Sequence, residues 1–445
     1  MQRRLLSARV ASVLPVTIVF VACTPFLAAN TIHVPADQPT IQQAIDAAVA
    51  GDIVLVSPGK YKEHIDFKGK AITVTSVQGP AVTIIDGGKT VFPVVTFESQ
   101  EGLSSRLSGF TIRNGAASFG SGINLTGASA TITNNYFTLN NEGSGGYGAA
   151  IGGNGSSAVV EDNVFWKNTC DGQFLSGVVS FINTSSPIIA NNIFHNNACR
   201  AIDMTLPQGS QPYVVNNTIF NNAVGIHVDA RIPTSQQIYE NNLMVSNQIG
   251  LEVVFDQPGD DPTWKNNDVF HSGVDYSGID DQTGISGNIS VNPKVLSSKN
   301  YHLQSGSPAI DAGDSNAPGL PPTDFDGFAR KQGSAVDIGA YEFFASAAEI
   351  SPSALTVGNQ AVRTASPAQN VMVQNTSATP LFLAISITGN FHQSSDCGQV
   401  LNPGASCIVQ VVFKPTQAGT RKGTLKFSDN ASGSPQAARL TGNGV

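Results

Sequence analysis

Three short segments place an acidic or imidazole side chain at the same point of a recurring apolar pattern. The segments are AIDM (201–204), GIHV (225–228) and GLEV (250–253). In each segment an aliphatic residue (Ile202, Ile226 or Leu251) stands directly before the polar one. On a β-strand the aliphatic side chain would face the core, so Asp203, His227 and Glu252 would face outward. Asp229 stands two residues after His227 and faces the same side. Carboxylates beside an imidazole favour its charged form and suit it to proton transfer.

The same column admits other roles. Two carboxylates and an imidazole are also a donor set for a divalent metal, and outward polar residues on a strand are often simply solvated. Arg200 and Arg231 flank the column in the sequence. Three hypotheses therefore stay open: catalysis by these acidic and imidazole groups, binding of a sugar or metal, and an exposed face without a ligand.

A phrase with paired asparagines recurs through the middle of the chain and predicts how these residues come together. The second residue of each pair is an asparagine, at positions 135, 163, 192, 217, 242 and 267, so the interval is 25 to 29 residues. Each unit carries short apolar runs of period two and a turn signal, with no helical pattern. A fixed period of this length predicts a solenoid of stacked coils, here a right-handed parallel β-helix.

Stacking gives the asparagines a structural role. Coils of a β-helix lie about 4.8 Å apart, so side chains at equivalent positions lie above one another. Asparagine amides can then bond along the axis as a ladder, and asparagine tolerates the left-handed backbone of a tight turn. An inward column of aromatic rings is also expected, formed by Phe110, Phe137, Phe165, Phe194, Phe220 and Phe270. The same stacking should bring Asp203, His227 and Glu252 onto one face.

Charge and the first residues predict the compartment. Residues 1–29 resemble a secretory signal, with arginines followed by the apolar run VASVLPVTIVFVA, and cleavage is expected after Ala29. No later apolar run is long enough to cross a membrane. The formal net charge is −8, and loss of three signal arginines makes the mature chain more acidic. We therefore expect an extracytoplasmic protein, secreted or at the cell surface, that does not bind nucleic acid, although a local basic site remains compatible.

Four of the five cysteines predict two disulfides. Cys170 and Cys199 each lie seven residues after their repeat marker, which places them in register on adjacent coils. Cys397 and Cys407 bracket the segment CGQVLNPGASC near the other end of the chain. Paired cysteines are typical of an exported chain. The alternative, a zinc site, lacks a histidine at a suitable spacing from either pair.

A short amphipathic helix is expected ahead of Gly51, because Ile41, Ala44, Ile45 and Ala48 repeat at helical spacing. It would shield the open end of the first coil, which every solenoid must cover. The surrounding segment PTIQQAIDAAVAGDIVLVSPGKYKE resembles the start of secreted β-helix proteins of the pectin-lyase-like superfamily. That resemblance implies the fold and no particular active site. The β-helix is expected over residues 31–342.

Residues 307–342 form the expected terminal cap. SPAIDAGD, DFDGFAR and VDIGAYE together resemble the choice-of-anchor Q segment that ends many bacterial surface β-helices. The acidic residues of this cap are Asp311, Asp314, Asp324, Asp326, Asp337 and Glu342. One hypothesis is calcium binding by Asp324 and Asp326, whose DFDG string resembles the start of a calcium loop, although the remaining ligand spacing is missing. The other is an ion-paired lid over the last coil, with Arg330 bonding Asp337 or Asp326.

A second domain is expected at the end of the chain. Residues 343–349 are an expected linker, and 350–445 carry longer alternating strands that predict an immunoglobulin-like β-sandwich. The string from CGQVLNPGASC to LTGNG resembles the choice-of-anchor D domain. Members of that family are sandwich modules, and the resemblance implies binding or spacing rather than catalysis.

Three functions follow from these features. The first is an exported β-helix protein that binds carbohydrate or a cell-surface polymer along its solenoid face. The second is a polysaccharide lyase or glycoside hydrolase that uses Asp203, His227 and Glu252. Against it, the chain lacks the Gly-His-Gly and Arg-Ile-Lys strings of polygalacturonase-like enzymes. The third is a non-catalytic surface spacer or adhesin. The sequence predicts no particular oligomeric state.

Overall fold

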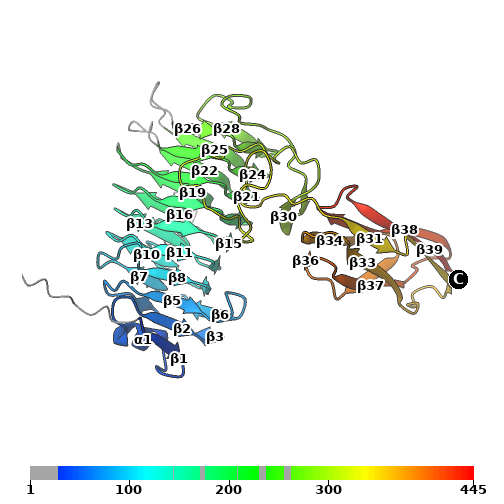
Figure 1. Ribbon diagram of the computed structural model, residues 1–445, viewed down its shortest axis with the longest axis horizontal. Helices are drawn as coiled ribbons and strands as arrows, with labels where there is room; N and C mark the ends of the chain where they lie inside the picture. Colours follow the sequence, from blue (N-terminus) through cyan, green and yellow to red (C-terminus); the bar gives the residue numbers. More distant parts are fainter. Residues whose placement is uncertain (1–28, 144, 171–175, 208, 230–236, 255–261) are drawn as a thin grey trace, which may run out of the picture.

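Two units built from β-strands make up the described chain (Figure 1). The structure is a computed structural model that describes residues 29–143, 145–170, 176–207, 209–229, 237–254 and 262–445. In the first unit, three parallel sheets of ten, nine and nine strands run along a solenoid of stacked coils. We name them sheets A, B and C in the order in which each coil visits them. The all-β prediction is confirmed, as is the parallel β-helix.

The strand bounds show how regularly the coils repeat. Sheet A contains β1 (Thr31–Val34), β2 (Ile53–Val56), β5 (Thr73–Ser76), β8 (Arg106–Ser108), β11 (Thr131–Thr133), β14 (Val159–Glu161), β17 (Ile188–Ala190), β20 (Tyr213–Val215), β23 (Ile238–Glu240) and β26 (Thr263–Lys265). Sheet B contains β3 (Gly59–Tyr61), β6 (Thr83–Asp86), β9 (Thr111–Arg113), β12 (Tyr136–Thr138), β15 (Val164–Trp166), β18 (Ile193–His195), β21 (Thr218–Phe220), β24 (Leu243–Val245) and β27 (Asp268–Phe270). Sheet C contains β4 (Ile65–Asp66), β7 (Val95–Phe97), β10 (Ile123–Thr126), β13 (Ile151–Asn154), β16 (Gly177–Ile182), β19 (Arg200–Thr205), β22 (Val224–Asp229), β25 (Ile249–Val254) and β28 (Val274–Ser277).

Two buried asparagine ladders fix the turns of the coils. The first joins Asn135, Asn163, Asn192, Asn217, Asn242, Asn267 and Asn288, and in each step the backbone N–H and the side-chain Nδ2 donate to the next Oδ1 at 2.9 to 3.2 Å. The second joins Asn140, Asn168, Asn197, Asn222 and Asn247 in the same way. The residue before each first-ladder asparagine is left-handed, with φ of 50 to 58° from position 134 to position 266. The predicted structural role of asparagine is confirmed.

The inward aromatic column is shorter than predicted. The inner positions of sheet B, in register, are Ile112, Phe137, Phe165, Phe194, Ile219, Met244 and Val269. Three of them are stacked phenylalanines with ring centroids 4.7 and 4.5 Å apart. Phe220 and Phe270 face outward, because each stands one residue later after its asparagine pair and a shift of one residue changes the face. Phe110 is buried just before β9, outside this column.

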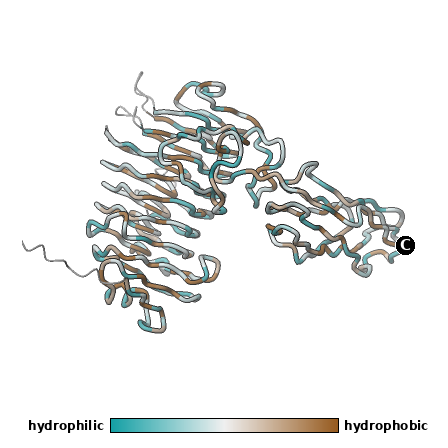
Figure 2. The backbone as a smooth tube through the Cα atoms, viewed as in Figure 1, coloured by the Kyte–Doolittle hydropathy of each residue, from teal (hydrophilic) through white to brown (hydrophobic). Residues whose placement is uncertain are grey.

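The predicted helix covers the first coil. Helix α1 (Ile41–Ala47) buries Ile41, Ala44 and Ile45, and the Thr40 side chain accepts a hydrogen bond from the Gln43 N–H at its start. At its end, Lys70 Nζ donates to three backbone carbonyls. Figure 2 shows hydrophobic and hydrophilic residues alternating along the coils, as expected for strands with one face in the core.

The segment after the last coil turns back along the solenoid. It begins with the hairpin of β29 (Val295–Ser297) and β30 (Asn300–Leu303). Its later residues then contact the corner between sheets A and B, where Asn191, Asn216, Asn241 and Asn266 stack in successive coils. Apolar residues of the segment cover the outward side chains of sheet B, and the two sets together are Ile193, Phe220, Leu243, Val245, Tyr301, Leu303, Ala309, Ile338, Ala340 and Tyr341. The segment therefore covers the side of four coils, whereas a lid over the last coil was expected.

The second unit consists of two sheets, consistent with the predicted β-sandwich, and all their strand pairs are antiparallel except β32 with β39, which is parallel. One contains β31 (Ala348–Ser351), β33 (Gln369–Asn375), β37 (Ser406–Phe413) and β35 (Phe391–Ser395). The other contains β32 (Ala354–Gln360), β39 (Gln436–Gly444), β38 (Gly419–Asp429), β34 (Leu381–Ile387) and β36 (Val400–Leu401). Their facing side chains form a separate core.

Both predicted disulfides are present. Cys170 and Cys199 are bonded on adjacent coils, with Cα atoms 5.6 Å apart, and Cys397 and Cys407 are bonded within the sandwich. Among the described residues, no helix is long and apolar enough to cross a membrane. The two disulfides are compatible with an extracytoplasmic location.

Candidate functional site

Four successive strands of sheet C carry the polar column. Ser180, Asp203, His227 and Glu252 are paired in register in β16, β19, β22 and β25. Each of these strands has six residues, whereas the other strands of the solenoid have two to four. The predicted stacking of Asp203, His227 and Glu252 is therefore present, on the widest part of the sheet. The preceding aliphatic residues are buried in the core, as expected.

The column is more buried than its outward direction suggested. Asp203 is 1% exposed and His227 is 3% exposed. Glu252 and Arg200 are the accessible members, with side chains that are each 16% exposed. A molecule that approaches sheet C therefore meets Arg200 and Glu252 first.

Asp203 holds the imidazole of His227 in a fixed orientation. Its Oδ1 lies 2.6 Å from His227 Nδ1, and its Oδ2 accepts a hydrogen bond from Ser180 Oγ at 3.3 Å. The other ring nitrogen, Nε2, has no hydrogen-bond partner among the described residues. The Oε2 atom of Glu252 lies 3.9 Å from it. A carboxylate on Nδ1 with a free Nε2 is the arrangement in which histidine acts as a general base.

Arg200 crosses the column. Its Nη1 donates to Asp203 Oδ1 at 3.4 Å and its Nη2 donates to Glu252 Oε2 at 3.1 Å. The guanidinium thus bridges two carboxylates that lie two coils apart, on either side of His227. This charge balance makes a cluster of buried acids tolerable.

Two other predicted members have different positions. Asp229 ends β22, is 8% exposed, and is not joined to His227 in the part of the chain that the structure describes. Arg231 lies outside the described residues, as does the signal segment up to residue 28.

Ser180 was missed by the sequence reasoning. The signal was present, because VVSF (178–181) has the same aliphatic–polar order as the three segments that were recognised. The column also continues toward the start of the solenoid, through Gly152, Asn124, Thr96 and Asp66. It is therefore one outward-facing register of sheet C, in which charged side chains occupy successive coils from Asp203 onward, and Asp66 is a separate acid near the first coil.

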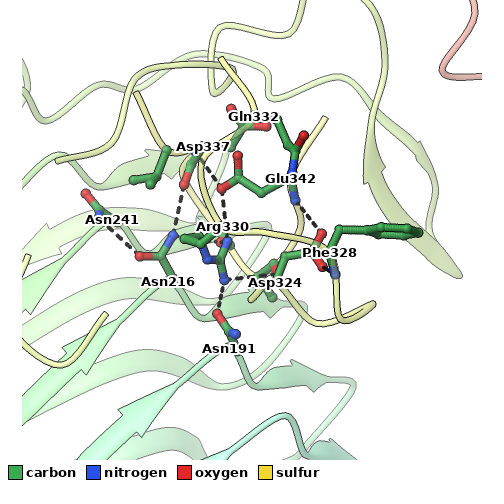
Figure 3. Close-up of polar contacts among 12 residues, drawn as sticks. Asn191, Asn216, Asn241, Asp324, Phe328, Arg330, Gln332, Asp337 and Glu342 are labelled. Atoms are coloured by element: carbon green, nitrogen blue, oxygen red, sulfur yellow. Dashed lines mark hydrogen bonds and ion pairs between the residues drawn. The ribbon is translucent and has the colours of Figure 1, made fainter. Parts of the chain in front are cut away.

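Three acidic residues of the 307–342 segment, Asp324, Asp337 and Glu342, are buried in a polar network beside the asparagine corner (Figure 3). Arg330 pairs with Glu342 at 3.2 Å and also donates to Asn191 and to two backbone carbonyls. Its predicted pairing with Asp337 or Asp326 is therefore wrong. Burial raises the pKa of Glu342 and of Asp337, and Asp337 accepts hydrogen bonds from the backbone N–H groups of residues 311 and 343.

The two proposed calcium ligands have other partners. Asp324 accepts hydrogen bonds from three backbone N–H groups, and burial raises its pKa. Asp326 lies 2.6 Å from His302 Nε2. Calcium prefers a shell of oxygen ligands, and these carboxylates are bonded to N–H groups and an imidazole instead. Calcium binding by Asp324 and Asp326 therefore stays a prediction without support from these contacts. The one close group of three metal-ligand side chains in the described residues includes Cys397 and Cys407, whose sulfurs are already bonded to each other.

Comparison with known proteins identifies the architecture. Residues 61–243 match the family model for the right-handed β-helix region. The first unit is a right-handed parallel β-helix. No curated protein matches the chain.

Thirteen chains of solved structure match. One is the ASH / PapD-like domain of human CEP192 (PapD-like domain 7), with 13% identity, a TM-score of 0.20, and coverage of 22% of this chain and 84% of that one. Another is the secreted serine protease VesC from Vibrio cholerae, with 16% identity, a TM-score of 0.18, and coverage of 22% of this chain and 23% of that one.

Proposed function

We propose that the protein is exported and binds a polysaccharide or another cell-surface polymer along the outer face of sheet C. The supporting observation is the in-register column of polar side chains on its four longest strands. A polymer repeats its hydroxyl groups along one direction, and coils about 4.8 Å apart repeat donors and acceptors in the same way. The β-helix is consistent with carbohydrate-related proteins in general.

Within this site, the accessible side chains take different roles from the buried ones. Arg200 and Glu252 would contact the polymer, because they are the exposed members of the column. Asp203 and His227 would position them from behind. Export rests on the predicted signal over residues 1–29, and two disulfides suit an oxidising compartment.

A glycan array probed with the full mature chain tests this function. We expect selective binding, and Glu252→Gln should weaken it by about tenfold, because a charged hydrogen-bond acceptor is lost. Glu349→Gln is a matched control, since Glu349 is an exposed glutamate in β31 of the sandwich. An array signal no higher than background would refute the proposal, and would favour a surface spacer or adhesin.

A second candidate function is proton abstraction in a polysaccharide lyase. The observation that favours it is the free Nε2 of His227, whose Nδ1 is held by Asp203. In such a reaction, Nε2 takes the proton next to a uronate carboxyl, a C=C bond forms as the glycosidic C–O bond breaks, and the leaving oxygen takes its proton from the His227 imidazolium. Arg200 would neutralise the uronate carboxylate. Arg200 or Glu252 must move aside to admit the sugar, because His227 is 3% exposed.

Incubation with uronate polymers distinguishes this chemistry. A lyase produces an unsaturated, UV-absorbing product, whereas a glycoside hydrolase produces only new reducing ends. His227→Ala should abolish either activity, while His392→Ala, at an exposed histidine in β35, should leave it unchanged. Activity that survives His227→Ala would show that the site has been misassigned.

A further inference from the structure

The turns that connect sheet B to sheet C in the early coils carry the most exposed apolar side chains of the described chain. Val91 and Phe92, in the turn after β6, are 76% and 63% exposed, more than any other large apolar side chain in the described residues. The turns after β12 add Leu139 and Tyr147, which are 50% and 39% exposed. We call these four residues the apolar turn patch. Single exposed apolar residues are common, whereas a group of them on neighbouring turns marks a contact surface.

Hydrogen bonds between the turns hold successive coils over one another at this corner. The Val94 N–H donates to the Ser121 carbonyl at 3.1 Å, which joins the turn after β6 to the turn after β9. The Tyr147 N–H donates to the Ser118 carbonyl at 3.0 Å, which joins that turn to the one after β12. The apolar turn patch therefore extends along one side of the solenoid over three coils.

Three lysines lie beside the apolar turn patch. Lys89 and Lys167 line one pocket together with Leu139, and the Lys62 side chain lies against Gly88 at the start of the first turn. All three lysines are exposed, and none forms an ion pair with a described residue. Unpaired lysines also occur elsewhere in the described chain, so the lysines alone mark no site. The particular feature here is their position beside protruding apolar side chains.

Acidic side chains in these turns do not offset the lysine charges. Residues 87–93, 114–122 and 139–150 contain one acid, Glu142, and it is 1% exposed. Asp86, directly before the first turn, is buried and paired with Lys60 and Arg113. The chain as a whole has a net charge of −8, so this side of the solenoid reverses the sign locally and attracts anionic surfaces.

Apolar tips with cations beside them suit the surface of a membrane. The tips enter the boundary between headgroups and acyl chains, and ammonium groups are attracted to anionic lipids. We propose that the protein docks on an anionic lipid bilayer through the apolar turn patch. Val91 and Phe92 enter the interface, and the three lysines lie beside the headgroup phosphates. Pairing of the patch with itself in a second copy of the chain would instead bring like charges together.

This docking is separate from the proposed function. The apolar turn patch lies on turns of earlier coils than those that carry Asp203, His227 and Glu252. Its ligand is a lipid surface, whereas the polymer is proposed to bind the outer face of sheet C. The two proposals can therefore fail independently.

Cosedimentation of the full mature chain with lipid vesicles tests the inference. We expect binding to vesicles of equal parts phosphatidylglycerol and phosphatidylcholine to be about tenfold stronger than binding to pure phosphatidylcholine. The double variant Val91→Ser, Phe92→Ser should bind the anionic vesicles about tenfold more weakly, because the inserted apolar area is lost. Lys89→Gln should weaken binding by about fivefold, and added salt should weaken binding of the wild type.

Matched controls are available at the other end of the solenoid. Ile285 and Lys299 are exposed residues that follow β28 in the chain, so Ile285→Ser and Lys299→Gln should bind vesicles like the wild type. All the substituted side chains are exposed, and their urea midpoints should stay at the wild-type value. Phe92→Trp places a reporter in the patch. Its emission should shift to shorter wavelength and be quenched by brominated lipid, beyond any change seen in the wild type.

Several results would overturn the inference. One is wild-type binding that is no stronger to anionic than to neutral vesicles. Another is unchanged binding by the folded double variant, which would mean adsorption by charge alone. Self-association that the double variant abolishes, without vesicle binding, would assign the patch to a second copy of the chain. Vesicle binding that depends on Val91 and Phe92 would support the inference even if the glycan array stayed at background, and a glycan signal without vesicle binding would refute it while leaving the proposed function intact.

Discussion

Asp203 and His227 point away from the core and are nevertheless buried. The alternation of aliphatic and polar residues predicts direction, because successive side chains of a strand face opposite sides. It does not predict exposure, which depends here on Arg200 lying across the column and on neighbouring strands of equal length. The sequence was thus sufficient to predict that the site residues lie in register on adjacent strands. It was not sufficient to predict how their charges are balanced, because the Arg200 side chain joins carboxylates two coils apart.

Removing the central carboxylate should be costly. In Asp203→Ala, His227 and Arg200 lose a buried partner, and we expect the free energy of unfolding of the solenoid to fall by about 3 kcal/mol. Urea unfolding measures this. Ser180→Ala removes one neutral hydrogen bond to the same carboxylate and the acceptor of the Gly177 N–H, and should cost less, about 2 kcal/mol. Equal effects of the two substitutions would show that Asp203 is not the centre of the network.

At the scale of the elements, the sequence repeat correctly predicted the stacked coils, but it did not correctly predict for every residue whether the side chain faces the core or the outside. Six asparagine positions at a nearly constant interval were enough to place strands in register, because the ladder and the left-handed turn both need that residue type. The prediction that Phe220 and Phe270 face inward is wrong, because it relied on their being aromatic and not on their distance in residues from the ladder asparagine of the same coil. Counting from the ladder residue gives the correct face, because the inner position is two residues later in every coil.

The asparagine ladder should carry much of the solenoid's stability. Asn192 accepts from Asn163, donates to Asn217 and donates to the carbonyl of Val160, all in the buried interior. Asn192→Ala leaves these groups unsatisfied and should cost about 3 kcal/mol in chemical unfolding. Asn124→Ala, at a half-buried position on the outer face of sheet C, should cost less than about 1 kcal/mol. A small loss at Asn192 would mean that the ladder is dispensable.

A buried acid of β27 should make the solenoid pH-sensitive. Burial raises the pKa of Asp268 to about 7, while one oxygen accepts the Val291 N–H. Between about pH 4 and pH 7 the folded state therefore holds a proton that the unfolded state has lost, so this residue's contribution to stability falls as pH rises through that window. Asp268→Asn removes the effect, and its stability relative to wild type should increase from pH 4.5 to pH 7.5 by on the order of 2 kcal/mol. Parallel pH profiles of the urea midpoint for the two proteins would contradict this.

At the scale of the whole molecule, the segment 307–342 lies where the solenoid most needs cover. Strands β21 and β24 are apolar on their outer as well as their inner side, with Phe220 and Leu243 facing outward. Strands buried on both faces read as continuous apolar runs, so TIF and LMV already indicated that something packs on sheet B. Which segment does so could not be predicted from local patterns, because the contacts join residues more than 100 positions apart.

His302 connects this covered side to the sandwich. Its ring lies between those of Tyr341 and Phe382, at centroid distances of 3.9 and 3.8 Å, and its Nε2 faces Asp326. His302→Ala removes the ring that joins the hairpin of β29 and β30 to strand β34, so the sandwich should become more mobile relative to the solenoid. We expect faster proteolysis within residues 343–349 and a larger radius of gyration in solution scattering. His392→Ala, at an exposed histidine on β35, should change neither quantity. Identical cleavage rates for wild type and His302→Ala would mean that other contacts, such as the bond from Asn430 to the Phe344 carbonyl, are sufficient to hold the two units together.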